Sequence, residues 1–106
     1  MRESDFQSKL IKEIKERYPG AIVLKNDAGY RKGFPDLTVL YKKHWGVLET
    51  KKEEKASHRP GQDNYVERLN EMSFARFINP ENKEEVLDEM DTAFKSRRNT
   101  RVSKRK

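Results

Sequence analysis

Two short runs of β-forming residues, separated by a polar turn, constrain the fold of this chain more than any other feature. They span residues 33–41 and residues 45–51. Both runs contain charged residues where a buried strand normally has none, and such local inconsistencies are typical of functional sites. The pair therefore predicts a β-hairpin that carries a functional site.

The charged residues of the two runs are Asp36, Glu49 and Lys51. Side chains alternate between the faces of a strand, so Glu49 and Lys51 share one face. Asp36 joins that face if it pairs with Lys51, which also sets Thr38 opposite Glu49 and leaves Lys43 and His44 at the hairpin tip. A shift of one residue would turn Asp36 to the other face.

Two carboxylates with a lysine between them are suited to a Mg²⁺ site. Mg²⁺ prefers oxygen ligands and keeps several waters, as Asp36 and Glu49 would allow. Lys51 cannot be a ligand, but it can orient a water molecule and stabilise negative charge on a phosphate. The alternative is structural, because a Pro-Asp turn and an exposed Glu-x-Lys both recur by chance.

Composition limits the class of protein. A chain of 106 residues predicts one domain, and with 33% apolar and 40% charged residues its core must be concentrated in a few elements. The absence of cysteine excludes disulfides, thiolate zinc sites and cysteine nucleophiles. No apolar run approaches the roughly 20 residues of a membrane span, and no secretory signal is recognisable. We expect a soluble, cytoplasmic protein.

The net charge of +6 is concentrated at the C-terminus, where residues 95–106 contain seven basic side chains and no acid. Removing these seven from +6 leaves −1 for the rest. We expect a domain over residues 1–94 and a flexible basic tail over residues 95–106, with Arg97 and Arg98 as candidate DNA contacts. The tail is either an electrostatic arm for a phosphate backbone or a solvated segment that aids solubility.

The first helix is predicted over residues 3–18, with Ser4 and Gln7 as a possible capping box. Glu3 extends the apolar stripe of this helix instead of its solvent face. It is either a charge favoured by the helix dipole or a third carboxylate aimed at the metal.

A strand is predicted over residues 21–25, followed by a loop that leads into Asp36. In this loop Arg31 and Lys32 would lie near substrate phosphates, and Tyr30 would stack on a splayed base. Lys52, next to the hairpin lysine, is a further candidate DNA contact. Each of these residues has an ordinary surface role as its alternative.

A second helix follows Pro60 and Gly61, with Tyr65, Val66, Leu69 and Met72 as its core stripe. Gln62 lies on the same inward face at the start of this helix. It either ties down the strand of Lys51 or is simply a polar residue at a helix entrance. A fourth strand over residues 74–78 and a last helix after Asn79 and Pro80 complete the domain.

The motif halves Pro35-Asp36 and Glu49-Thr50-Lys51 resemble those of the PD-(D/E)XK nuclease superfamily. The resemblance implies an α/β fold with the restriction-endonuclease-like αβββαβ core. In that fold a four-stranded mixed sheet is flanked by helices, here with an added C-terminal helix and basic tail.

Within the superfamily the chain resembles compact, stand-alone VRR-Nuc domains of phages and bacteria. The matching elements are Glu3-x-x-Phe6-Gln7, Gly33-x-Pro35-Asp36, Glu49-x-Lys51, and Pro60-x-Gln62 followed by Leu69. Where those domains usually have a glycine before the fourth strand, this chain has Met72-Ser73. Archaeal-type Holliday junction resolvases are similar in size and motif order.

The resemblance implies a Mg²⁺- or Mn²⁺-dependent endonuclease that hydrolyses DNA phosphodiester bonds. Small members act as homodimers on branched or Holliday-junction DNA, as in DNA repair. Asp36, Glu49, the Thr50 carbonyl and Glu3 would hold the metal, Lys51 would position water, and Gln62 would belong to the same site. The alternatives are a catalytically silent DNA-binding module, a nuclease without junction preference, and a site-specific nuclease of restriction type.

Overall fold

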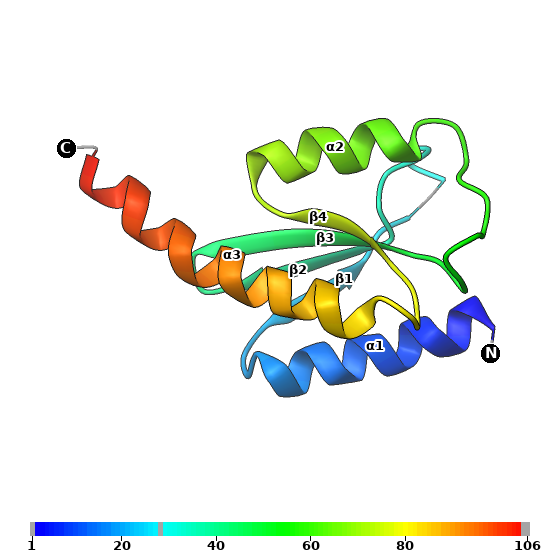
Figure 1. Cartoon of the computed structure of the whole chain (residues 1–106), viewed down its shortest axis with the longest axis horizontal. Coiled ribbons are helices and arrows are strands. Elements are labelled where there is room, and N and C mark those ends of the chain that lie inside the picture. Colours follow the sequence, from blue (N-terminus) through cyan, green and yellow to red (C-terminus); the bar gives the residue numbers. More distant parts are fainter. Residues whose placement is uncertain (1, 28, 105–106) are drawn as a thin grey trace.

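The structure, a computed structural model, describes residues 2–27 and 29–104, with side chains as far as Lys95. Its elements follow the predicted order of helix, three strands, helix, strand and helix (Figure 1). They are α1 (Glu3–Arg17), β1 (Ile22–Lys25), β2 (Leu37–Tyr41), β3 (His44–Thr50), α2 (Gln62–Met72), β4 (Ala75–Ile78) and α3 (Lys83–Lys104). Among the described residues, no helix has both the length and the apolar composition needed to cross a membrane.

The four strands form one mixed sheet in the order β1-β2-β3-β4. β1 pairs with β2 and β2 with β3 in antiparallel fashion, whereas β4 runs parallel to β3. A parallel neighbour requires a crossover connection, and α2 provides it. The predicted four-stranded mixed sheet is therefore confirmed.

The predicted register of the β2-β3 hairpin is wrong. Thr38 lies opposite Val47 instead of Glu49, a shift of two residues along β3. Because side chains alternate with a period of two, this shift keeps every residue on its predicted face. Asp36 therefore stays on the side of Glu49, and the predicted pairing with Lys51 is replaced by an approach to Glu49.

The register also moves the hairpin tip from Lys43 and His44 to Lys42 and Lys43. Tyr41 pairs with His44, and Lys42 takes a positive φ of 57° in the two-residue turn. His44 is held in the strand because its ring stacks on Phe94 of α3, with 5.3 Å between the ring centroids. The two-residue turn fixes this register, and the contact between His44 and Phe94 stabilises it.

Helices α1 and α3 pack side by side on one face of the sheet and enclose the main core (Figure 1). Ile14, Leu37, Leu48 and Leu87 in this layer are completely buried. Burying each such side chain contributes roughly 1.5–3 kcal/mol. Ion pairs bridge the two helices at their surface, including Lys83 to Glu13 at 2.7 Å.

The start of α1 differs from the predicted capping box. Arg2 is the N-cap residue, and no side chain caps the helix. Glu3 is the first helical residue, so it is not displaced outside the helix by a cap at Ser4. Gln7 instead extends from α1 to β3, where its Nε2 donates to Thr50 Oγ1 at 3.1 Å.

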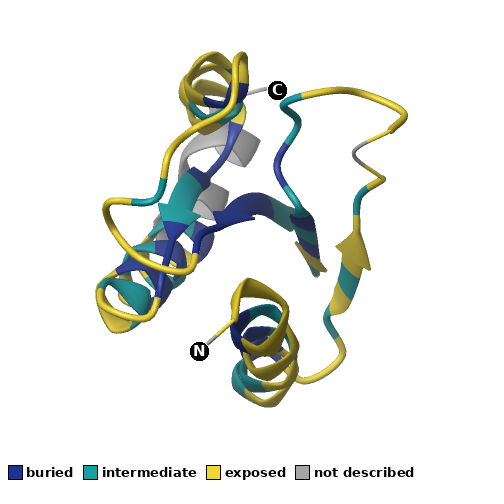
Figure 2. Ribbon diagram, turned by 90° about the vertical axis from the view of Figure 1, so that its right-hand side faces the viewer, coloured by how far each residue is buried: buried dark blue, intermediate teal, exposed yellow. Residues whose placement is uncertain are grey.

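The other face of the sheet is only partly covered, because α2 packs over β3 and β4 (Figure 2). Met72 is 63% exposed, so its predicted place in the core stripe is wrong. This methionine is the last residue of α2. Ile22, Leu24 and Leu40 on the outer face of β1 and β2 are 56%, 46% and 37% exposed.

Candidate active site

Asp36 and Glu49 meet at the open end of the hairpin. The backbone N–H of Asp36 donates to Glu49 Oε1 at 3.1 Å. In return, Asp36 Oδ2 accepts from the backbone N–H of Thr50 at 3.0 Å and from its Oγ1 at 2.6 Å. These reciprocal contacts hold the two carboxylates together and leave Asp36 Oδ1 without a hydrogen bond from the described residues.

Lys51 lies on the same face of the sheet as Glu49, and both are buried, at 7% and 4% exposure. Lys51 Nζ is 3.8 Å from Glu49 Oε2. It also donates to the carbonyl of Ser57 at 3.0 Å and to Gln62 Oε1 at 2.8 Å. A buried ammonium group requires such partners, and they fix its position beside the carboxylates.

Gln62 links the parts of the site, which matches the first of its two alternatives. Its Nε2 donates to Glu49 Oε2 at 2.7 Å, and its Oε1 accepts from Lys51 Nζ and from the backbone N–H of Arg59, each at 2.8 Å. Gln62 is the one buried residue of α2. Its single amide therefore orients Glu49 and Lys51 and anchors the loop before α2.

The site is unfavourable for two negative charges. Burial, followed by the charge of Asp36, raises the pKa of Glu49 from 4.5 to about 7, and the charge of Lys51 opposes this rise. A divalent cation would offset the same repulsion. Mg²⁺ is commonly held by one or two carboxylates together with waters and substrate phosphates, so Asp36 and Glu49 fit such an ion.

Glu3 lies at the edge of this arrangement. Its Oε2 is 3.5 Å from Thr50 Oγ1, and its side chain is exposed. In the described part of the chain, no three His, Cys, Asp or Glu side chains are grouped closely enough to hold a metal. The role of Glu3 as a third carboxylate and that of the Thr50 carbonyl stay predictions.

Sequence reasoning missed Gln7, which was interpreted as a capping residue. Gln7 donates to Thr50 Oγ1, and Thr50 in turn donates to Asp36. This chain of contacts orients the Asp36 carboxylate from α1. The available signal was helical spacing, because Gln7 follows Glu3 by four residues and therefore lies on the same helix face.

A groove of about 750 Å³ opens between the start of α1 and the loop after β3. Glu3 and Lys51 line it, as does Lys52, one of the predicted DNA contacts. Arg2, Lys55 and Arg59 were not predicted, yet they line the same groove. The sequence does not distinguish these three residues from other surface cations, because only folding brings them beside the site.

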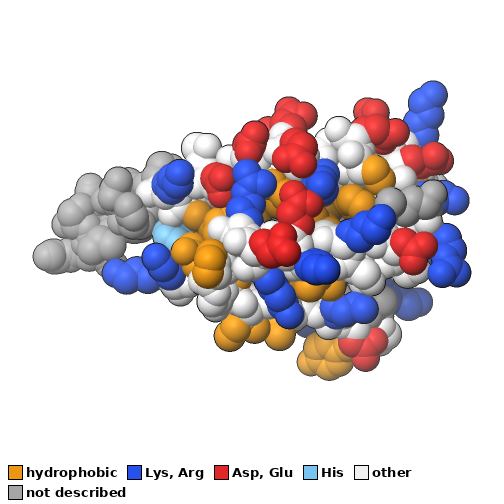
Figure 3. All heavy atoms as spheres, turned by 90° about the horizontal axis from the view of Figure 1, so that it is seen from below, with side chains coloured by type: hydrophobic (Ala, Val, Ile, Leu, Met, Phe, Trp, Pro, Cys, Tyr) orange, Lys and Arg blue, Asp and Glu red, His pale blue; other side chains and the backbone are white. Residues whose placement is uncertain are grey.

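The charge distribution of this groove differs from that of the surface formed by α1 and α3. On the face seen from below, acidic and basic side chains are interspersed (Figure 3). Such a mixture gives no extended field of one sign. The groove lining has five cations against two acids, Glu3 and Glu53, so the groove is the better candidate path for a phosphate backbone.

Three other predicted DNA contacts, Tyr30, Arg31 and Lys32, lie on the loop before β2. Tyr30 is 85% exposed, and Lys32 is exposed as well. Arg31 Nη1 donates to the Tyr65 hydroxyl at 3.1 Å, which joins this loop to α2. Arg97 and Arg98 lie outside the side chains that the structure describes.

The mixed sheet with helices on both faces defines an α/β fold, and its hairpin brings Asp36 and Glu49 together. More specifically, a solved VRR_NUC domain matches with a TM-score of 0.58 and 24% sequence identity, over 76% of this chain and 92% of that one. The predicted VRR-Nuc-like fold is thus confirmed. No family model and no curated protein matches the sequence.

Proposed function

We propose that this protein is a metal-dependent DNA endonuclease that hydrolyses phosphodiester bonds. The observation that carries this proposal is the convergence of Asp36, Glu49 and Lys51 at the open end of the hairpin, with Gln62 bonded to two of them. The fold shared with a VRR_NUC domain supports it.

Asp36 and Glu49 would hold Mg²⁺ or Mn²⁺, with Glu3 and the Thr50 carbonyl as further oxygen donors. When bound, such an ion supplies positive charge to the reacting phosphate and increases the acidity of water. The hydrogen bonds from Thr50 to Asp36 and from Gln62 to Glu49 keep the two carboxylates oriented before substrate arrives.

The chain's own cations complete the chemistry. Lys51, held by Gln62 and the Ser57 carbonyl, positions a water molecule for in-line attack and stabilises the charge that develops on the phosphate. Water oxygen forms a bond to phosphorus and releases a proton to solvent, one P–O ester bond breaks, and the leaving oxygen takes a proton from solvent. The groove lined by Arg2, Lys52 and Lys55 would bind the phosphate backbone.

Branched or Holliday-junction DNA is the proposed substrate, cut by a homodimer. A junction requires two cuts related by a two-fold axis, whereas the described residues of one chain form one such site. The exposed apolar side chains of Ile22, Leu24 and Leu40 offer a surface on which a second copy would pack.

A catalytically silent DNA-binding module is the second candidate. The basic groove would suffice for it, with binding that weakens steeply as salt rises. The buried contacts among Glu49, Lys51 and Gln62 favour the enzyme, because burying charged groups is costly and a binding surface has no need of them.

Cleavage of labelled DNA tests the proposal. Wild type, Asp36→Asn and Lys51→Ala are incubated with a four-way junction, a flap and a linear duplex, in Mg²⁺ or EDTA. We expect wild type to cut the junction in Mg²⁺ alone, and each variant to lose at least about 100-fold in rate.

Matched controls are Asp88→Asn and Lys12→Ala, which change exposed residues outside the site. Both should cut like wild type. Persistent cutting by Asp36→Asn would contradict the site, equal cutting of duplex and junction would contradict the branched preference, and binding without any cutting would indicate the silent module.

A further inference from the structure

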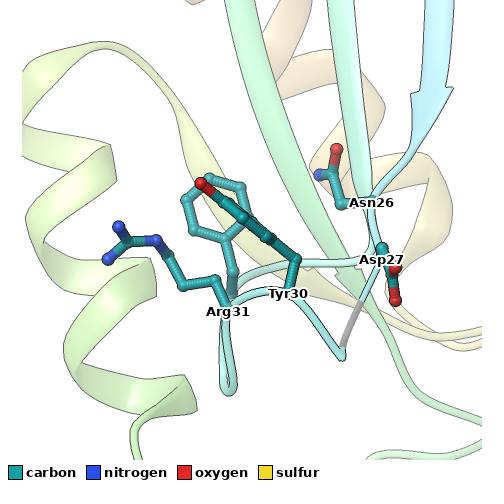
Figure 4. Close-up of a pocket in the computed structure, with 5 residues that line it drawn as sticks. Asn26, Asp27, Tyr30 and Arg31 are labelled. Atoms are coloured by element: carbon teal, nitrogen blue, oxygen red, sulfur yellow. The ribbon is translucent and has the colours of Figure 1, made fainter.

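A second pocket, of about 410 Å³, lies in the loop before β2 and has no part in the proposed hydrolysis. Figure 4 shows the Tyr30 side chain between those of Arg31 and Asn26. Asp27 and Phe34 complete the lining. The volume is within the range of small-molecule sites, which is roughly 300–1,000 Å³.

Two aromatic rings provide the apolar surface of this pocket. Tyr30 is 85% exposed, although a large aromatic side chain normally buries most of its surface. Phe34 is held in place by an edge-to-face contact with Tyr65, with ring centroids 5.3 Å apart. The pocket thus combines an anchored ring with a ring that is open to a planar ligand.

Some polar atoms of the pocket accept no hydrogen bond from the described residues. Asn26 Nδ2 donates to the Pro35 carbonyl and to Thr38 Oγ1, each at 2.9 Å, so the orientation of the amide is fixed. Asn26 Oδ1 accepts no hydrogen bond from the described residues. Asp27 Oδ1 accepts from the backbone N–H of Gly29 at 2.8 Å, which leaves Oδ2 available.

Arg31 adds a cation to these acceptors. Its side chain is exposed and donates to Tyr65 alone among the described residues, so further N–H groups are available for a phosphate. An aromatic surface, hydrogen-bond acceptors and a cation are the groups that complement a nucleotide. The base would stack, its exocyclic amino group would donate, and its phosphate would pair with Arg31.

The pocket adjoins the proposed active site through Asn26. Its backbone N–H donates to the carbonyl of Asp36 at 2.7 Å, so a nucleotide in the pocket would lie close to the scissile phosphate. A base inside a duplex is stacked and paired on both sides, and reaching such a pocket would require flipping it out. A base that is already unpaired at a branch avoids that cost.

We propose that this pocket binds an unpaired nucleobase beside the scissile phosphate, stacked on Tyr30, with its exocyclic amino group toward Asn26 and Asp27. The inference rests on the proposed function, since the bound base belongs to the DNA that is cut. It gives branched DNA a physical basis for selection: the unpaired nucleotide is read directly. Adenine, cytosine and guanine have the required amino group, whereas thymine lacks it.

Binding is measured separately from cleavage, with flap DNA in Ca²⁺ and with 2-aminopurine at each unpaired position near the branch. Wild type should quench the fluorescence at one position by stacking, Tyr30→Phe should retain the quenching, and Tyr30→Ala should abolish it. Loss of one base stack should weaken flap binding by about 5- to 150-fold, with duplex binding unchanged.

The decisive comparison replaces the base at the quenched position by an abasic site. The abasic flap should bind wild type as weakly as Tyr30→Ala binds the intact flap, and thymine there should bind more weakly than cytosine. Met72→Ala, another exposed large side chain, is the control and should match wild type. Circular dichroism should show all variants folded.

Equal affinity of Tyr30→Ala and wild type for the intact flap would overturn the pocket assignment. Equal affinity for thymine and cytosine would overturn the amino-group contact. A protein that shows Tyr30-dependent base binding but cuts no DNA in Mg²⁺ would support the pocket and contradict the nuclease proposal, so the two failures are distinguishable.

Discussion

Glu49 has the most demanding position of any residue in the site. It accepts from the backbone of Asp36 and from Gln62, lies 3.8 Å from Lys51 Nζ, and is 4% exposed. A carboxylate in such surroundings is tolerated only while its neighbours are in place. Two predictions at the scale of single residues follow from its contacts.

The first prediction concerns pH. The pKa of Glu49 is about 7 in the folded protein and near 4.5 when unfolded, so the folded state binds the additional proton between these values. In EDTA the free energy of unfolding should therefore fall as pH rises from about 4.5 to 7, by roughly 3 kcal/mol, and then level off. Urea unfolding at several pH values measures this decrease.

Glu49→Gln is the matched variant for this measurement, because the amide keeps the shape and does not titrate. The difference in unfolding free energy between wild type and Glu49→Gln should change with pH only in this window. An unchanged pH profile in the variant would show that Glu49 is not the source.

The second prediction concerns Gln62. Gln62→Ala removes partners from buried Glu49 and Lys51, which should lower the free energy of unfolding by about 1–3 kcal/mol. The cleavage rate kcat should fall by about 10- to 100-fold with little change in KM, because the groove that binds DNA remains. Asn64→Ala, an exposed neighbour on α2, is the control. A change in KM alone would argue against a positioning role.

At the scale of elements, the site depends on a contact between two loops. Gly33, with φ +81°, precedes β2, and a Cβ there would lie 3.1 Å from the Pro60 carbonyl oxygen and from the carbonyl carbon of Gly61. Gly61 is the N-cap of α2, the helix that carries Gln62. The close approach of these glycines therefore sets the distance between Asp36 and Gln62.

Gly33→Ala should separate these loops, whereas Gly20→Ala provides the matched control. Gly20 has a similar φ of +93°, but no atom lies within 4 Å of the Cβ position. In both variants the positive φ should lower the free energy of unfolding by about 1 kcal/mol. Gly33→Ala should lower it by roughly a further 1–3 kcal/mol, because the loops clash, and should also lose cleavage activity. Denaturant unfolding and the junction assay measure both effects. Equal losses in the two variants would contradict the loop contact.

At the scale of the whole molecule, the helices are distributed unequally over the sheet. α1 and α3 cover one face, and α2 covers β3 and β4 on the other, so the outer face of β1 and β2 stays open. Three large apolar side chains lie there at least 37% exposed. This open face of β1 and β2 is the surface proposed for a second copy.

Leu24→Glu should weaken self-association by about 10- to 100-fold, because a charge replaces apolar surface that the dimer would bury. Sedimentation velocity with and without junction DNA measures the change. Met72→Glu, which changes an exposed apolar side chain outside this face, should sediment like wild type. A wild-type monomer bound to junction DNA would contradict the dimer.

The order of elements and the shared face of Asp36, Glu49 and Lys51 were predictable from local patterns in the chain, whereas the mixed sheet was implied by the family resemblance. Period-two and helical patterns are local, and the face of a strand residue survives any register shift of two. Three features required tertiary structure: the register in which His44 stacks on Phe94, the contact from Gln7 to Thr50, and the basic groove. Each joins residues that are distant in the chain, and no local pattern encodes which distant side chains will meet.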